Sequence, residues 1–510
     1  MKAIGLSIAL LLFGSTLWAQ DVQEINPGAP PVPPPIMTVL QYPVDGISSW
    51  LPFSPMASNV TPEPLSLIDH FLPPVHDDDY DKAHPKDTVT TPTFHILPPE
   101  PALPNSLEND RSLNASGVNY YDSTKTQHGV TVLDLMTRSI IVDMNGKVLK
   151  KMPIGFPNLL ADGSVVGAME KGANLIKVDA DMDIEWKTSA TPHHEVTVGE
   201  DGAVYLLSKE DHEFMGVTTQ FDIIKKYSAQ GKLVYKWCLY DHLKEFMFII
   251  SQSAYLRNLK VPYDEAKGVE TYIAQDPSYF FLPTFQADTL NRKCRYELSH
   301  FNSIQELPEN EVSKTIPAFK KGNLLLSFNP YSCYGVLNVS NNHIEWVGYL
   351  PERTTLHTPV LTPNGTILVY QNSTEKNAWV NKLDRPCLDR LLKKNPAQNA
   401  ADEPIDRNWL SINEYDPLNN HLVWEYTASP KESLRAGGLG NAQRLANGNT
   451  LVCAATEKGG KVFEVTPEKE IVWYYVSPEM DPEHNYPLSF YRAKRVGYDI
   501  AQKVVPGFKP

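Results

Sequence analysis

Three histidines, His194, His300 and His357, lie at related positions in a repeated sequence pattern. An imidazole can bind a metal ion, exchange a proton near neutral pH, or attack an electrophilic centre. Asn302 lies two residues after His300, so the two side chains share one face of an extended strand. If the three imidazoles converge, they would suit either metal binding or acid, base and nucleophilic catalysis.

The relation between these histidines comes from turn residues. Four turns end in Asp-Gly or Asn-Gly, at Gly163, Gly202, Gly365 and Gly448. The residue eight positions before each glycine lies on the preceding strand, and these residues are Gly155, His194, His357 and Gly440. Aligning Leu307–Asn310 with the other turns gives Asn302 the same position in the one unit that lacks the glycine. Asp-Gly and Asn-Gly predict tight hairpins whose two central residues both have positive φ.

The repeats predict an all-β fold, a six-bladed β-propeller. Five units of four short strands are visible, at residues 155–186, 194–237, 300–346, 357–426 and 440–473. A sixth blade is expected to combine 129–150 with Phe490–Tyr498, which would close the ring and remove exposed edges. The innermost strands line the centre of a propeller, so the histidines are expected to meet there, with His193 facing the other way. The tryptophans that end the units are expected to pack between blades.

The chain divides into three regions. Residues 1–19 predict a signal peptide, with Lys2, the apolar run Ile8–Phe13 and a cleavage site after Ala19. Residues 20–115 form a proline-rich extension, and residues 116–510 form the propeller, the expected catalytic domain. No later stretch has the roughly eighteen apolar residues of a membrane span. We therefore expect a periplasmic or secreted protein with no stable membrane span after signal cleavage.

The amino-acid composition limits the kinds of partner that the protein is expected to bind. A net charge of −14 argues against nucleic acid as a partner. The five cysteines could form two disulfides and leave one free thiol, and none lies in the CxxC spacing of a structural zinc site. We expect no metal and no cofactor. Insertions at 238–298, with a helical apolar pattern over Leu243–Leu259, and at 379–408 are expected to cap or shape the site.

The segments around these histidines resemble the aryl-sulfate sulfotransferase family over roughly residues 128–500. They are Pro192–Val196 (PHHEV), His300–Ile304 (HFNSI), Leu356–Pro359 (LHTP), Asn441–Leu451 and Tyr491–Arg495. The resemblance implies a six-bladed propeller that moves a sulfuryl group from an aryl sulfate to a phenolic acceptor. It also implies independence from a nucleotide sulfate donor, consistent with the lack of a P-loop pattern.

The resemblance also implies roles for individual residues. His357 would be the nucleophile that forms a sulfated histidine. His194 and His300 would bind the sulfuryl oxygens or the bridging oxygen, and Asn302 would help to hold them. A neutral imidazole can attack sulfur, and cationic groups can stabilise the oxygens as their charge changes.

Two positions depart from the family pattern. An arginine that clamps the sulfuryl oxygens is expected in a Ser-x-Arg phrase, where this chain has Asn329 after Ser327. An amide donates a hydrogen bond but lacks the charge and the fork of a guanidinium. Arg353, four residues before His357, is a candidate replacement. Glu195 stands where an aspartate is commoner.

Two other functions fit the same residues. One is a non-catalytic ligand-binding propeller that has lost the arginine clamp. The other is a metal- or quinone-dependent oxidoreductase, which is disfavoured because the blades carry no adjacent cysteine pair and no carboxylate-rich calcium site. The physiological donor and acceptor, the disulfide pairing and the oligomeric state do not follow from the sequence.

Overall fold

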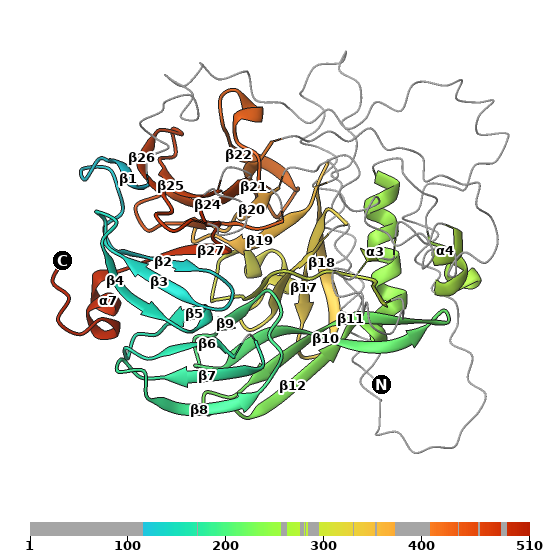
Figure 1. Cartoon of the computed structure of the whole chain (residues 1–510). Coiled ribbons are helices and arrows are strands. Elements are labelled where there is room, and N and C mark those ends of the chain that lie inside the picture. Colours follow the sequence, from blue (N-terminus) through green and yellow to red (C-terminus); the bar gives the residue numbers. More distant parts are fainter. Residues whose placement is uncertain are drawn as a thin grey trace, which may run out of the picture. The chain divides into compact units, whose positions relative to one another are not determined.

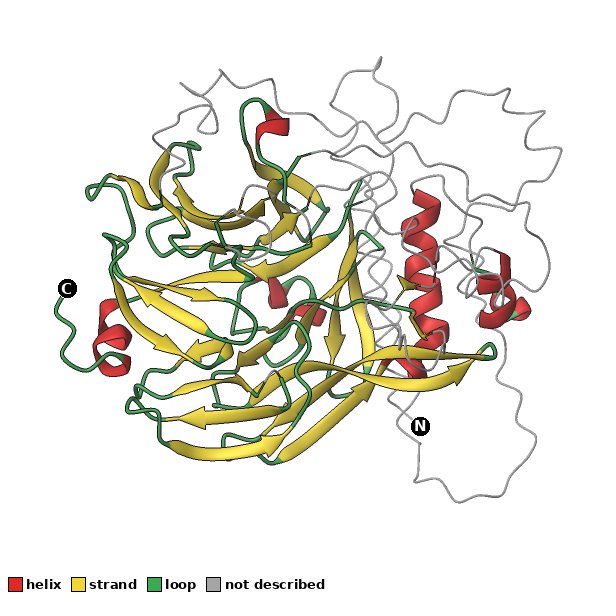
Figure 2. Cartoon of the chain, in the orientation of Figure 1, coloured by secondary structure: helices red, strands yellow, loops and turns green. Residues whose placement is uncertain are grey.

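A computed structural model describes residues 116–510, except for 171, 257–262, 276–279, 281, 284–294, 330, 352–353, 373–408, 437, 457–458 and 481–486. These residues belong to one compact unit, Thr38–Pro510. Their strands form six sheets arranged in a ring, as Figures 1 and 2 show. The predicted six-bladed β-propeller is therefore confirmed. The predicted signal peptide and proline-rich extension lie outside the described residues.

Each sheet is one blade, and in blades 2 to 6 the first strand of the repeat lies at the inner edge of the sheet, nearest the centre of the ring. Blade 2 contains β5 (Gly155–Leu159), β6 (Val165–Met169), β7 (Asn174–Val178) and β8 (Ile184–Ser189). Blade 3 contains β9 (Val196–Val198), β10 (Val204–Phe214), β11 (Val217–Tyr227) and β12 (Leu233–Cys238). Blade 4 contains β15 (Ile304–Glu306), β16 (Leu324–Phe328), β17 (Cys333–Asn338) and β18 (His343–Tyr349).

The remaining blades complete the ring. Blade 5 contains β19 (Leu356–Leu361), β20 (Ile367–Gln371), β21 (Ser411–Asp416) and β22 (His421–Thr427). Blade 6 contains β23 (Asn441–Arg444), β24 (Thr450–Thr456), β25 (Gly459–Val465) and β26 (Ile471–Val476), and β1 (Gly117–Tyr121) extends its outer edge. Blade 1 contains β2 (Val130–Asp134), β3 (Ser139–Val142), β4 (Val148–Met152) and β27 (Arg492–Val496).

Blade 1 joins the two ends of the propeller sequence. Strand β27 pairs antiparallel with β2, from Val130 opposite Val496 to Asp134 opposite Arg492. The blade therefore takes its innermost strand from the C-terminal part of the chain, as the sequence predicted. Because β27 fills the inner edge of this blade, its side chains on one face reach the centre of the ring.

The turns between first and second strands differ from the predicted type. In the turn of blade 2, Leu160 and Ser164 close a loop of three residues, with Leu160 N donating to Ser164 O at 2.9 Å. Gly163 has a φ of 95°, whereas Asp162 is not among the residues with positive φ. The turn is thus a three-residue hairpin with one left-handed glycine, not a two-residue turn with two. Blades 3, 5 and 6 repeat it at Gly202, Gly365 and Gly448.

The tryptophans that end the units link neighbouring blades, as predicted. In four blades the indole nitrogen donates to a backbone oxygen between the third and fourth strands of the next blade. These bonds are Trp186 to Ala229 (2.9 Å), Trp237 to Asn342 (3.1 Å), Trp424 to Pro467 (2.8 Å) and Trp473 to Met144 (2.9 Å). Trp346 instead packs on Phe319, with ring centroids 4.9 Å apart.

Side-chain amides link the innermost strands. Asn158 donates to the carbonyl of Val196 at 2.8 Å, which joins β5 to β9. Asn441 exchanges two hydrogen bonds with the backbone of Ala493, which joins β23 to β27. Backbone groups near the ring centre thus obtain partners from the next blade, since no further strand lies inside them.

The insertion 238–298 lies outside the regular blade pattern. Its predicted helix is present as α3 (Leu243–Leu256), which contacts β18 and α4 (Val269–Gln275). The other helices in the described part of the chain are α7 (Tyr498–Val504) and the short 3-10 helices η4 (Leu239–His242), η5 (Glu265–Lys267), η6 (Val312–Lys314), η7 (Pro317–Phe319) and η9 (Lys431–Ser433). Strands β13 (Leu282–Pro283) and β14 (Arg295–Glu297) extend blade 3. The insertion 379–408 lies outside the described residues. Among the described helices, none combines the length and apolar character needed to cross a bilayer.

Two of the five cysteines, Cys238 and Cys453, are free, buried thiols, and Cys333 is buried as well. Cys238, Cys333 and Cys453 belong to β12, β17 and β24, which lie in three different blades. Cys294 and Cys387 lie outside the described residues. The possibility of two disulfides is therefore wrong, because the free thiols of Cys238 and Cys453 leave only three cysteines, too few for two bonds.

Candidate active site

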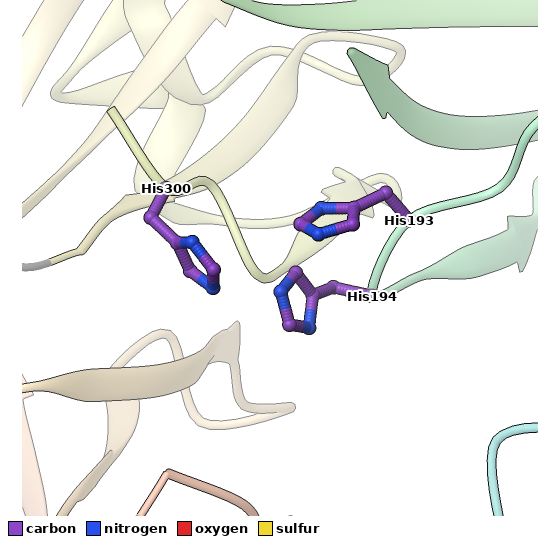
Figure 3. Close-up of side chains that lie close together, drawn as sticks. All are labelled: His193, His194 and His300. Atoms are coloured by element: carbon purple, nitrogen blue, oxygen red, sulfur yellow. The ribbon is translucent and has the colours of Figure 1, made fainter. Parts of the chain in front are cut away.

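The inner edges of blades 3, 4 and 5 bring histidines toward the centre of the ring. His194 lies just before β9, and His357 is the second residue of β19. His300 lies before β15, where its backbone nitrogen donates to the Asn329 carbonyl at 3.0 Å. The rings of His194 and His300 have centroids 4.5 Å apart (Figure 3). Two of the three predicted histidines are thus in direct ring contact.

His193 joins this pair, against the expectation that it faces away. Its ring centroid lies 3.9 Å from that of His194 and 5.4 Å from that of His300. Figure 3 shows both rings projecting from one segment toward His300. The two-residue alternation fails here because His194 has a φ of 65°, and β9 begins only at Val196. We call His193, His194 and His300 the histidine cluster.

Tyr491 fixes the orientation of the His194 ring. The Tyr491 hydroxyl donates to the His194 carbonyl oxygen at 2.9 Å, so it accepts the hydrogen of His194 Nδ1 at 2.8 Å. The neutral ring then carries its lone pair on Nε2. Burial lowers the pKa of His194 well below its usual value, and the neighbouring histidines and Lys209 lower it further. His194 is therefore a neutral ring at pH 7.

Glu297 holds the His300 ring. Its Oε1 lies 2.9 Å from His300 Nδ1, and the same carboxylate pairs with Lys209. Although burial opposes the charged form, His300 and Lys209 lower the pKa of Glu297 to about 2. A carboxylate only accepts hydrogen bonds, so Nδ1 of His300 carries a hydrogen.

His357 stands apart from the cluster in a fully buried position. Its Nδ1 lies 3.3 Å from the Gly440 carbonyl oxygen, and its ring stacks on Tyr370 at 6.2 Å between centroids. Burial lowers the pKa of His357 to about 3, and the positive charge of Arg492 contributes to this shift. A carbonyl only accepts, so Nδ1 donates and the lone pair lies on Nε2. The arrangement leaves a neutral imidazole with a defined tautomer.

Arg492 is the functional candidate that the sequence did not reveal. It begins β27 and pairs with the Glu195 carboxylate, and it donates to the backbone oxygen of Asn302. Its Nε has no hydrogen-bond partner among the described residues. In the sequence, the available indication of its role was its position in the segment Tyr491–Arg495, which resembles the family and forms the closing strand. Since β27 is an innermost strand, alternation along it could have placed Arg492 near the other candidates.

The three remaining predicted site residues differ in their position and contacts. Asn302 is fully buried, and its amide accepts from Ser327 Oγ at 2.6 Å and donates to the Leu356 carbonyl at 2.9 Å. It therefore braces the strand that carries His357. Asn329 is buried beside His300, and its Oδ1 has no hydrogen-bond partner among the described residues. Arg353 lies outside the described residues.

A small cavity borders the Arg492–Glu195 pair. Asp134 and Lys494 also line it, from blade 1. Burial raises the pKa of Asp134 to about 6, although Met136 N and Phe156 N donate to its carboxylate. Burial also lowers the pKa of Lys494. Charged groups of both signs therefore line this space next to the histidines.

The propeller matches a known protein family. A family model described as arylsulfotransferase (ASST) matches residues 131–477, more than half of the chain. The match ends before β27, so Arg492 lies outside it. No curated protein matches the chain.

Solved structures with similar chain traces have little sequence identity to this chain. One is a protein of unknown function from Bacteroides caccae, 11% identical, with coverage of 72% of this chain and 98% of that one and a TM-score of 0.39. Another is virginiamycin B lyase from Staphylococcus aureus, 10% identical, with coverage of 63% and 69% and a TM-score of 0.31. A protein from Desulfotomaculum acetoxidans is 10% identical, with coverage of 71% and 99% and a TM-score of 0.35. Identities and scores this low carry no functional argument.

Proposed function

Because this chain belongs to the arylsulfotransferase family, we propose that it transfers a sulfuryl group from an aryl sulfate to a phenolic acceptor through a sulfated His357. The reaction would need no nucleotide sulfate donor. The observation that carries the proposal is the His357 tautomer. Its Nδ1 is committed to the Gly440 carbonyl, so Nε2 offers the lone pair that a nucleophile needs.

The reaction proceeds in two steps. In the first, His357 Nε2 attacks the sulfur of the donor, an N–S bond forms, and the S–O bond to the aryl group breaks with its electrons on the leaving phenoxide. In the second, the acceptor gives its proton to solvent, from which the released phenoxide takes one up; the acceptor oxygen attacks the same sulfur, and the N–S bond electrons return to Nε2. Burial keeps the ring neutral at pH 7, so no proton has to leave Nε2 before the first step.

The surrounding residues supply contacts to the oxygens of the sulfuryl group. His194 and His300 take the places that the family resemblance gives to oxygen-binding groups. Arg492 takes the part of the family arginine in place of Asn329, because its charge acts on His357 and its Nε lacks a partner among the described residues. A guanidinium next to the developing negative charge lowers the barrier to transfer. Asn302 holds the β19 backbone rather than the substrate.

Turnover of a chromogenic aryl sulfate tests the proposal. Without a phenol we expect the purified protein to release at most one chromophore per chain, and with a phenol we expect continuous release, which His357→Ala should slow by at least about 1,000-fold. His421→Ala, on the exposed start of β22, is the matched control and should keep the wild-type rate. Release by the wild type no faster than by His357→Ala would favour the non-catalytic binding propeller.

We further propose that the protein acts in the periplasm or after secretion. The support is the N-terminal sequence, in which Lys2 precedes the apolar run Ile8–Phe13 and the small residue Ala19. Cell fractionation tests this, together with the N-terminal sequence of the mature protein. A chain that is retained in the cytoplasm with Met1 or Lys2 at its start would contradict it.

A further inference from the structure

The histidine cluster has unused nitrogens that hydrogen bonding within the protein does not explain. His193 Nδ1 and His194 Nε2 are buried, and neither has a hydrogen-bond partner among the described residues. Buried polar atoms without partners are rare in proteins, and a bound ion or water is one of their common explanations. One nitrogen from each of the three rings lies within 4.8 Å of the other two. This separation allows all three to bind one ion.

The Nδ1 hydrogens of His194 and His300 point away from the centre of the histidine cluster. In His194 the hydrogen on Nδ1 goes to Tyr491, so the lone pair of the neutral ring is on Nε2. In His300, Nδ1 is engaged by the Glu297 carboxylate, and a ligand nitrogen on this ring would be Nε2. A neutral imidazole nitrogen with a lone pair cannot donate a hydrogen bond to a sulfuryl oxygen, but it can bind a metal ion that contacts the oxygen. The oxygen-binding role proposed for His194 and His300 would then act through the ion.

The hydrogen bonds that His194 and His300 make on the side away from the cluster centre are typical of metal-binding histidines. Such histidines commonly donate their second nitrogen to a carboxylate or another oxygen, which fixes the tautomer and orients the ring. Glu297 does this for His300 and Tyr491 for His194. Lys209, whose positive charge acts on His194, pairs with the same Glu297 carboxylate. The hydrogen bonds that orient His194 and His300 therefore fit a divalent cation at the cluster centre.

We propose that His193, His194 and His300 bind one divalent transition-metal ion of the Zn²⁺ class, with a coordination position left for an oxygen of the substrate. Three imidazole ligands and an open position form the usual ligand set of a catalytic zinc site. The site deepens the proposed function, because the ion would hold the donor's oxygen and add its positive charge to that of Arg492. Its role in transfer rests on that function, whereas metal binding itself does not.

Titration with Co²⁺ tests the site directly. The full chain, stripped with a chelator, is titrated with CoCl₂ without any sulfate donor, and visible absorption and bound metal are measured. We expect one Co²⁺ per chain with the bands of a four-coordinate ion, and displacement of Co²⁺ by Zn²⁺. Each of His193→Ala, His194→Ala and His300→Ala should abolish the bands, whereas His421→Ala should bind like the wild type.

A second variant keeps the test valid if an alanine variant fails to fold. Glu297→Gln keeps all three ligands but weakens the hold on His300, so Co²⁺ affinity should fall roughly 10- to 100-fold. Zn²⁺ should also raise the thermal midpoint of the wild type, since an ion that binds only the folded state stabilises it. No stoichiometric Co²⁺ binding, or equal binding by the cluster variants and the wild type, would overturn the site.

The site and the proposed function can fail separately. His357→Ala should bind Co²⁺ normally and lack transfer, because His357 is not a ligand. If the metal-free wild type transferred sulfuryl groups at the full rate, the role of the ion in transfer would be overturned. If Co²⁺ bound one to one but neither form of the wild type transferred sulfuryl groups, the proposed function would fail and the metal site would stand.

Discussion

The closing strand β27 carries two buried arginines with contrasting surroundings. Arg495 pairs with Glu464 at 3.3 Å and lies over the Trp473 ring at 4.8 Å, between blades 1 and 6. Arg492 pairs with Glu195 beside the candidate nucleophile His357. Both ion pairs are buried, but only the second lies among residues that could contact a substrate. The contrast distinguishes an arginine that stabilises the closed ring from an arginine that can take part in the reaction.

Replacing each arginine by methionine should separate these roles most strongly. Arg492→Met should lower sulfuryl transfer by at least about 100-fold, because the charge beside His357 is lost. Arg495→Met should leave the rate per folded molecule unchanged. Both should destabilise the protein by about 3–5 kcal/mol, since each leaves a buried glutamate without its partner. Chemical unfolding and steady-state rates measure the two effects.

The double variant Glu195→Gln/Arg492→Met removes the uncompensated charge and serves as the control for folding. It should recover stability relative to Arg492→Met without recovering transfer. Equal rates for Arg492→Met and Arg495→Met would remove Arg492 from the candidate site.

Repetition explains why the fold was easier to predict than the site. The turn phrases and the tryptophans recur in several blades, so the periodicity gave the blade number and the closure by β27. The reversed expectation for His193 has a local cause, since the positive φ of His194 ends the strand alternation. Arg492 was missed because its neighbours Glu195 and Asn302 are distant in sequence and meet it only when the ring closes.

The next contrast concerns two buried asparagines. Asn302→Ala should lower kcat roughly 10- to 100-fold with little change in KM, because the Leu356 carbonyl beside His357 loses its support. Asn449→Ala removes comparable hydrogen bonds to Lys125 and Glu464 at the turn of blade 6. It should cost about 1–3 kcal/mol of stability and leave kcat unchanged. A fall in kcat of the same size in both variants would contradict a positioning role for Asn302.

A smaller effect is expected at the contacts between blades. Trp186→Phe keeps the aromatic ring but removes the hydrogen bond to the Ala229 carbonyl. The free energy of unfolding should fall by about 1 kcal/mol, and the transfer rate should not change. Urea unfolding measures the first quantity. A changed transfer rate at equal folded fraction would argue against a purely structural contact.

The smallest effect is expected from pH. Burial lowers the pKa of His357 from its ordinary 6.5 to about 3, so the ring stays neutral across this interval. The single-turnover rate of the donor step should change by less than about twofold between about pH 5 and 8. Because the unfolded state takes up the His357 proton first, this residue's contribution to stability is lost as pH falls from 6.5 toward 3. A rate that halves near pH 6.5 would contradict a buried, neutral nucleophile.

The central claim is the covalent step at His357, and the mass of the intact protein after incubation with an aryl sulfate alone tests it most directly. The wild type should gain the mass of one sulfuryl group, located on His357 by fragmentation, and lose it when a phenol is added. His357→Ala should gain nothing, and His421→Ala should behave like the wild type. An unchanged wild-type mass together with phenol-dependent turnover, or a sulfuryl group on another residue, would contradict the claim.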